Sequence, residues 1–130
     1  GTLALAAANS YSGGTTVHGG TLLLDGGTGG NARIRGSLTV NPGATVAFAN
    51  DDGTGLGFNN GAKVDALQVN GGTVTTSGIM HVWNLTADLT GGTLQSNNGT
   101  SDPNGPQLEW NRASVTHGQV ACSEMTLSYN

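Results

Sequence analysis

A short pattern, Gly-Gly-Thr followed by an aliphatic residue, constrains the fold of this chain more than any other feature. It occurs at residues 19–22, 71–74 and 91–94, and a degenerate form, HGQV, stands at 117–120. The steps between aligned units are on the scale of roughly 20 to 50 residues that is typical of solenoid repeats. Repetition on this scale indicates structural units that stack on one another.

Short runs rich in Thr, Val and Leu occupy the chain around these motifs, and Gly, Asn or Asp bounds each run. Such runs are typical of strands separated by turns. The Ala-rich segment at 3–9 soon meets Asn and Gly, which disfavours a helix. The sequence therefore predicts an all-β protein, with strands within residues 1–6, 21–25, 37–40, 44–49, 65–69, 72–77, 81–89, 92–96 and 113–129.

A parallel β-helix explains why glycine pairs precede these strands. Each coil of such a solenoid supplies two or three short strands, and equivalent strands of successive coils pair at about 4.8 Å. Glycine can adopt the backbone conformations that a sharp corner demands. The predicted corners are Gly13, Gly14, Gly19, Gly20, Gly71, Gly72, Gly91 and Gly92.

The residues after each corner have predictable directions. Thr begins the next face, where its β-branch suits a pleated surface. The aliphatic residue after it points inward, so Leu22, Val74, Leu94 and Val120 are predicted to stack from coil to coil. Gly-Gly-Thr also occurs at residues 13–15, six residues before the copy at 19–21. These two copies are then two successive corners of one coil. The register between residues 25 and 65 is left open, and ARIR at 32–35 is predicted to be a solvated strand.

Composition limits the class of protein. The 130 residues fit one domain, and we expect residues 1–130 to be a single β-helix segment. A formal net charge of −4 with no basic run disfavours nucleic-acid binding, because neutralising phosphates requires clustered Lys and Arg. We find no apolar run of transmembrane length. Cys122 is the single cysteine, and it is either a small buried residue or an intermolecular cross-link.

Residues 1–24 resemble a known repeat, the autotransporter-associated β-strand repeat of bacterial autotransporter passenger domains. Its usual form begins Gly-Thr-Leu-x-Leu and continues Asn-x-Tyr-x-Gly-Gly-Thr-Thr-x-x-x-Gly-Gly-Thr-Leu. The matching residues are Gly1, Thr2, Leu3 and Leu5, then Asn9, Tyr11, Gly13, Gly14, Thr15 and Thr16, and finally Gly19, Gly20, Thr21 and Leu22. Residues 36–50 resemble the following segment of the family less distinctively.

This resemblance implies a right-handed parallel β-helix that is exposed on a bacterial surface or secreted, and that is often adhesive. It also implies that the chain is part of a longer repeat protein or assembly. From about residue 99 the sequence departs from the pattern. Residues 97–106 are predicted to form a loop inserted between coils.

Candidate sites are few. Asp51 and Asp52 adjoin and form a weak calcium candidate in a loop, but they lack the spacing of an EF-hand. Trp83 alternates with Val82 and is a possible outward platform for a glycan, with core filling as the alternative. His18, His81 and His117 show no metal-binding spacing. We predict no catalytic residues and no cofactor.

Three functions remain as hypotheses. The first is a structural or adhesive β-helix that contacts host, matrix or sibling chains through many weak contacts, without catalysis. The second is a fibre subunit that stacks end to end through open coil ends, since unpaired strand edges favour pairing with another chain. The third is a carbohydrate-active enzyme or an ice-binding β-helix. For ice binding, TVT at 73–75 is the one clean Thr-x-Thr element.

Overall fold

A computed structural model describes most of the first three quarters of the chain and separate strands of the remainder. The described residues are 1–7, 9–25, 34–49, 64–76, 80–83, 86–96, 107–111, 114–116, 119–121 and 124–127. For residues 80–83, for residue 96 and from residue 107 onward, the description covers the backbone alone.

Every described secondary-structure element is a strand, as the alternation of Thr with aliphatic residues predicts. In chain order they are β1 (Thr2–Leu5), β2 (Thr15–Val17), β3 (Gly20–Leu24), β4 (Gly36–Val40), β5 (Ala44–Phe48), β6 (Val64–Val69), β7 (Thr73–Thr76), β8 (Met80–Trp83), β9 (Thr86–Asp88), β10 (Thr93–Ser96), β11 (Gln107–Asn111), β12 (Ser114–Thr116), β13 (Gln119–Ala121) and β14 (Glu124–Leu127).

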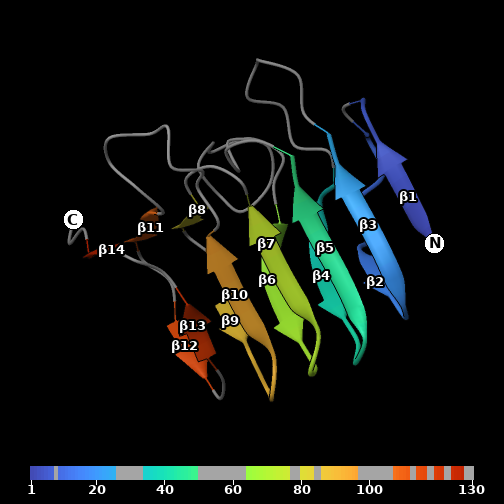
Figure 1. The fold of residues 1–130 in the computed structure, drawn as a ribbon. Helices are drawn as coiled ribbons and strands as arrows, with labels where there is room; N and C mark the ends of the chain where they lie inside the picture. Colours follow the sequence, from blue (N-terminus) through green and yellow to red (C-terminus); the bar gives the residue numbers. More distant parts are fainter. Residues whose placement is uncertain are drawn as a thin grey trace.

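The strands form three parallel sheets that are the faces of a β-solenoid (Figure 1). The six-stranded sheet has the order β1-β3-β5-β7-β10-β13, and the five-stranded sheet has the order β2-β4-β6-β9-β12. The third contains β8, β11 and β14. In Figure 1 the front strands point up, the back strands point down, and the chain order runs from right to left. This arrangement is a right-handed winding, so the predicted parallel β-helix is confirmed.

The core of the solenoid is built from columns of aliphatic side chains. On the six-stranded sheet, Leu22 pairs in register with Val46, Val46 with Val74, and Val74 with Leu94. All four are buried, and the backbone of Val120 continues the column. The predicted inward stack is therefore confirmed for Leu22, Val74 and Leu94.

The five-stranded sheet supplies the opposite wall of the core. Leu38 pairs with Leu67, and Leu67 with Ala87, and all three are buried. The strands of this sheet are less regular, because the register shifts between Gly36 and Ser37 where β4 pairs with β6. The columns of the two sheets belong to one hydrophobic cluster. Burial of aliphatic side chains between the two sheets stabilises the stack of coils.

The two glycines of a corner have different tasks. Gly71 and Gly91 have positive φ values of 74° and 65°, which side chains with a Cβ rarely adopt. Gly92 N–H donates to the carbonyl oxygen of Leu89 at 2.7 Å, which closes a β-turn with Gly91 at its third position. A positive φ at that position is what a type II turn requires.

The second glycine allows the next coil to approach closely. A Cβ on Gly72 would lie 2.7 Å from both the carbonyl oxygen of Asn41 and Cγ1 of Val40. A Cβ on Gly92 would collide with the Val69 carbonyl oxygen. Neither glycine has a positive φ, so close contact between coils explains them.

The remaining predicted corner glycines divide differently, because in each pair it is the second glycine that has the positive φ. Gly14 and Gly20 have positive φ values of 84° and 73°. Gly13 and Gly19 do not, and a Cβ on either would meet open space. Gly14 precedes β2 and Gly20 begins β3, and these strands lie in different sheets. The two motifs of residues 13–22 thus serve two successive corners.

The corner before β5 lacks the glycine pair but makes the same turn. The Ala44 N–H donates to the carbonyl oxygen of Asn41 at 3.0 Å. Pro42 occupies the second position of this turn and Gly43, with a φ of 77°, the third, which are the residues that a type II turn favours. Thr45 still falls in register with Thr21 and Thr73.

Some sequence-based strand predictions need correction. The run 81–89 is two strands, β8 and β9, and the run 113–129 is three. The sequence did not predict β2 or β11 as strands. Ile34 lies in a bend, fully buried, and Arg35 precedes the strand that begins at Gly36, so the prediction of a solvated strand at 32–35 is wrong for these residues. The predicted loop at 97–106 lies outside the described residues.

Candidate functional site

The outer face of the six-stranded sheet carries a column of threonines, which we call the threonine ladder. Thr2 pairs in register with Thr21, Thr21 with Thr45, Thr45 with Thr73, and Thr73 with Thr93. Because successive side chains of a strand point to opposite faces, and because the residue after each of the last four is a buried aliphatic, the threonines point outward. The ladder therefore consists of Thr2, Thr21, Thr45, Thr73 and Thr93.

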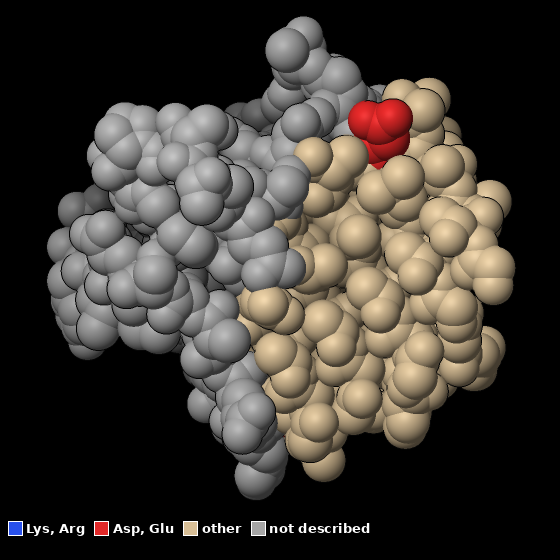
Figure 2. Space-filling view, viewed as in Figure 1, with Lys and Arg blue, Asp and Glu red and all other residues tan. Residues whose placement is uncertain are grey.

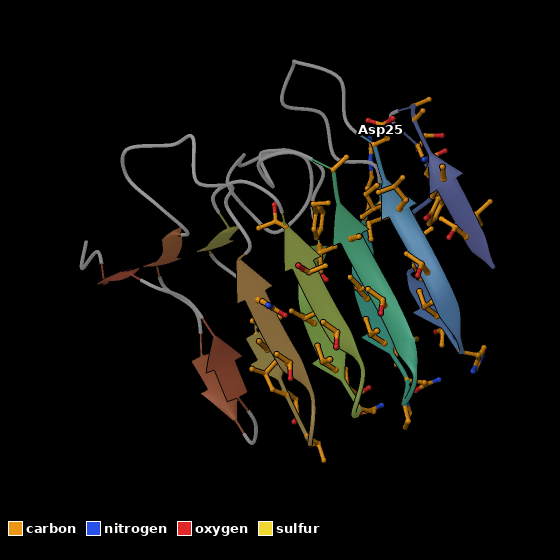
Figure 3. All side chains as sticks on the ribbon, viewed as in Figure 1. Asp25 is labelled. Atoms are coloured by element: carbon orange, nitrogen blue, oxygen red, sulfur yellow. The ribbon has the colours of Figure 1, made fainter. Side chains whose placement is uncertain are left out.

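A second outward column runs beside the ladder. This companion column consists of Ala4, Leu23, Ala47, Thr75 and Gln95, and none of these residues carries a charge. Figure 2 views this face and shows no charged group on its described part except an acidic one at the upper edge. Figure 3 labels Asp25 at that place, just beyond the end of β3. The described part of the face is uncharged between its edges.

The ladder hydroxyls are available to a partner. Within the described part of the chain, no hydrogen bond to protein involves the side chains of Thr21, Thr45, Thr73 or Thr93. Each is partly exposed. A hydroxyl both donates and accepts, so each of these groups can bond to water or to a group of a binding partner.

The outer face of the five-stranded sheet differs in charge and shape. It holds a shallow trough of about 230 Å³, lined by Ser37, Leu38, Thr39, Ala66, Leu67, Gln68, Thr86 and Asp88. The carboxylate of Asp88 accepts hydrogen bonds from the Thr90 hydroxyl at 2.7 Å and the Thr90 N–H at 3.2 Å. Asp88 thus stabilises the turn that follows β9.

A chain of polar side chains runs along the corner between the two sheets. The Asn41 side-chain amide lies 3.0 Å from Nδ1 of His18, and Asn70 donates to Oδ1 of Asn41 at 3.5 Å. These contacts join three successive coils at the same corner. His18 therefore contributes to the stacking of coils. Among the described residues, no group of three His, Cys, Asp or Glu side chains is placed to hold a metal ion.

The first coil leaves a hollow at the N-terminal end of the stack. Leu3 belongs to the inward column, since it pairs with Leu22, yet it is 62% exposed. Beneath it lies a hollow of about 440 Å³ that includes Val17, His18 and Leu22 in its lining. β1 and β2 are the edge strands of their sheets at this end. Apolar side chains and strand edges are accessible together here.

For the other predicted site residues the structure describes either the backbone alone or nothing. Asp51 and Asp52 lie outside the described residues, as do His117 and Cys122. Trp83 is the last residue of β8 and pairs with Asn111, and only its backbone is described. Within the described ranges, no helix is long and apolar enough to cross a membrane.

The comparison with protein families gave one match, at the N-terminal segment of the chain. Residues 1–24 match the family model of the passenger-associated-transport-repeat. The resemblance to an autotransporter passenger repeat is thereby confirmed for this segment, which contains β1, β2 and β3. Neither the curated proteins nor the solved structures gave a match to the chain. A passenger repeat of this family implies a surface or secreted location.

Sequence reasoning found the ladder only in part. It placed Thr after each corner as the start of a face, which gives Thr21, Thr73 and Thr93. Thr45 escaped notice because Pro-Gly-Ala replaces the glycine pair before it. The available signal was a series of four Thr-aliphatic pairs, of which three follow a glycine pair and one, Thr45-Val46, follows Pro-Gly-Ala.

Proposed function

We propose that this chain is a structural and adhesive β-solenoid segment of a bacterial surface or secreted protein, and that it catalyses no reaction. The observation that carries the proposal is the passenger-repeat match over residues 1–24, which lies in the first coils of a continuous parallel stack. The described part of the six-stranded sheet presents an uncharged outer face, on which the threonine ladder runs beside a column of mainly small or apolar side chains. Faces of this kind suit many weak contacts with a large partner, such as a host or matrix surface.

The described carboxylates do not favour an enzyme. Asp25 follows β3, Asp65 lies on β6, and Asp88 is engaged by Thr90 in a turn. Hydrolysis of a glycoside requires two carboxyl groups on either side of one bond. We therefore base the proposal on the surface of the solenoid.

Display on cells tests this function. The chain would be placed between an export signal and the translocation unit of a known autotransporter, with an antibody tag at its N-terminus. We expect intact cells to bind the antibody and to attach to matrix-coated wells more than cells that display the tag alone. A Leu94→Asp variant, which places a charge in the core, serves as the unfolded control.

Two results would contradict the proposal separately. Tag labelling that requires broken cells would reject the surface location. Normal labelling with attachment no greater than that of the Leu94→Asp variant would reject adhesion by the folded solenoid.

A second candidate is a fibre formed by end-to-end stacking, in which strand edges and apolar side chains of one molecule would pair with another. Leu3 is exposed beside the edges of β1 and β2. Electron microscopy of the concentrated chain tests this candidate, and filaments whose growth a Leu3→Lys variant abolishes would support it.

A further inference from the structure

The threonine ladder combines three properties that are useful for contact between flat surfaces. It repeats at the strand spacing of about 4.8 Å over five strands. The pairing from β1 to β10 shows no register shift, whereas the five-stranded sheet has one between Gly36 and Ser37. Its hydroxyls have no protein partner among the described residues. The companion column beside it carries no charged side chain.

The spacing of the ladder limits what can engage all of it at once. A partner must offer hydrogen-bonding groups with the same repeat along the solenoid axis. A second molecule of this chain has the same repeat, because its ladder has the same strand spacing. Stacked sheets pack face to face at about 10 Å, and identical short side chains can interdigitate between them.

Charge favours the same partner and the same face. The chain has a formal net charge of −4, so two molecules repel each other over most orientations. The outer face of the five-stranded sheet carries Asp65 and Asp88. Two acidic molecules meet with least repulsion on the uncharged described part of the six-stranded sheet (Figure 2).

We propose that the threonine ladder and its companion column are a pairing face for a second molecule of this chain. A two-fold axis parallel to the strands places ladder opposite ladder and companion column opposite companion column. Such an interface is isologous and closes after two molecules. It is a lateral contact, distinct from stacking through the coil ends, and its failure would leave the adhesive role of the segment untouched.

The face is small compared with the interfaces of stable complexes. Five strands span roughly 24 Å along the axis and the strands about 16 Å across it, which gives about 400 Å² for each molecule. Stable complexes bury about 800 Å² for each partner. Pairing of this segment is therefore weak, and the concentration series must extend to the millimolar range.

Introducing charges on two rungs of the ladder tests the proposal. Thr45 and Thr73 pair across β5 and β7, and Thr39 and Gln68 pair across β4 and β6 in the same two coils. The double variant T45E/T73E therefore has a matched control in T39E/Q68E on the opposite sheet. Sedimentation equilibrium measures the mass, and circular dichroism checks that each variant is folded.

We expect the unmodified chain and T39E/Q68E to approach the mass of a dimer. We expect T45E/T73E and T45K/T73K each to pair at least about tenfold more weakly, because like charges meet across the interface. An equimolar mixture of the two ladder variants should regain the dimer. Should a double variant unfold, the single changes T73E and T73K serve in the same mixing experiment.

Four outcomes would overturn the proposal. The chain could remain monomeric to millimolar concentration, or T45E/T73E could pair as well as the unmodified chain. The control T39E/Q68E could lose pairing equally. The mixture of oppositely charged ladder variants could fail to associate.

Discussion

Replacing one leucine at two positions of the same column measures what the interior of the solenoid contributes to stability. Leu94 and Leu3 occupy equivalent positions on β10 and β1, in the column that also contains Leu22. Leu94 is fully buried, whereas Leu3 is 62% exposed. The substitutions Leu94→Ala and Leu3→Ala therefore remove the same atoms from different surroundings.

The expected losses follow from burial. Leu→Ala removes three carbons, worth about 2.4 kcal/mol of transfer free energy when fully buried. A cavity in a packed core raises the loss for Leu94→Ala to about 3 to 4 kcal/mol. At Leu3 about two fifths of the surface is out of water and no closed cavity forms, so we expect a loss of about 1 kcal/mol.

Urea unfolding followed by far-ultraviolet circular dichroism gives both values, from the shift in midpoint at an unchanged slope. Equal losses for the two variants would refute the reasoning, since they would show that position in the column, and not burial, sets the contribution. A loss below about 1 kcal/mol at Leu94 would refute its placement in the core.

Two further variants test a corner and a turn. Gly72→Ala should destabilise the chain by about 1 to 3 kcal/mol, because its Cβ would lie 2.7 Å from the Asn41 carbonyl oxygen. The control is Gly13→Ala, where a Cβ meets open space. Equal melting temperatures of the two variants in thermal unfolding would contradict this account. Asp88→Ala removes the acceptor for the Thr90 N–H and hydroxyl. We expect the free energy of unfolding, measured in urea, to fall by about 1 kcal/mol. An unchanged free energy of unfolding would show that these hydrogen bonds add nothing to stability.

The sequence predicted the faces of the solenoid well because they are local patterns. Alternation of Thr with a buried aliphatic fixes which side of a strand faces the core, and the glycine pairs mark where strands end. Leu22, Val74 and Leu94 are accordingly buried in one column. The passenger-repeat match agrees with these patterns over residues 1–24.

The register across residues 25–65 could not be predicted, because it depends on contacts between coils. The corner at Pro42 and Gly43 has a different sequence from the others and one more residue between the inward Val40 and the ladder. Only the pairing of β5 with β3 and β7 places Thr45 in the ladder. Similarly, the local sequence does not show why each of Gly71 and Gly72 is a glycine. Gly71 has a positive φ, whereas at Gly72 a Cβ would collide with the neighbouring coil.

The extra residue in that corner has a consequence for protein engineering. The turn at Asn41, Pro42 and Gly43 absorbs a change in length while the flanking strands keep their hydrogen-bonding partners. Coil length is therefore decoupled from strand register at this edge of the molecule. A foreign peptide grafted between Pro42 and Gly43 would be carried on a rigid scaffold, and further grafts at equivalent corners would present it in a row along the axis.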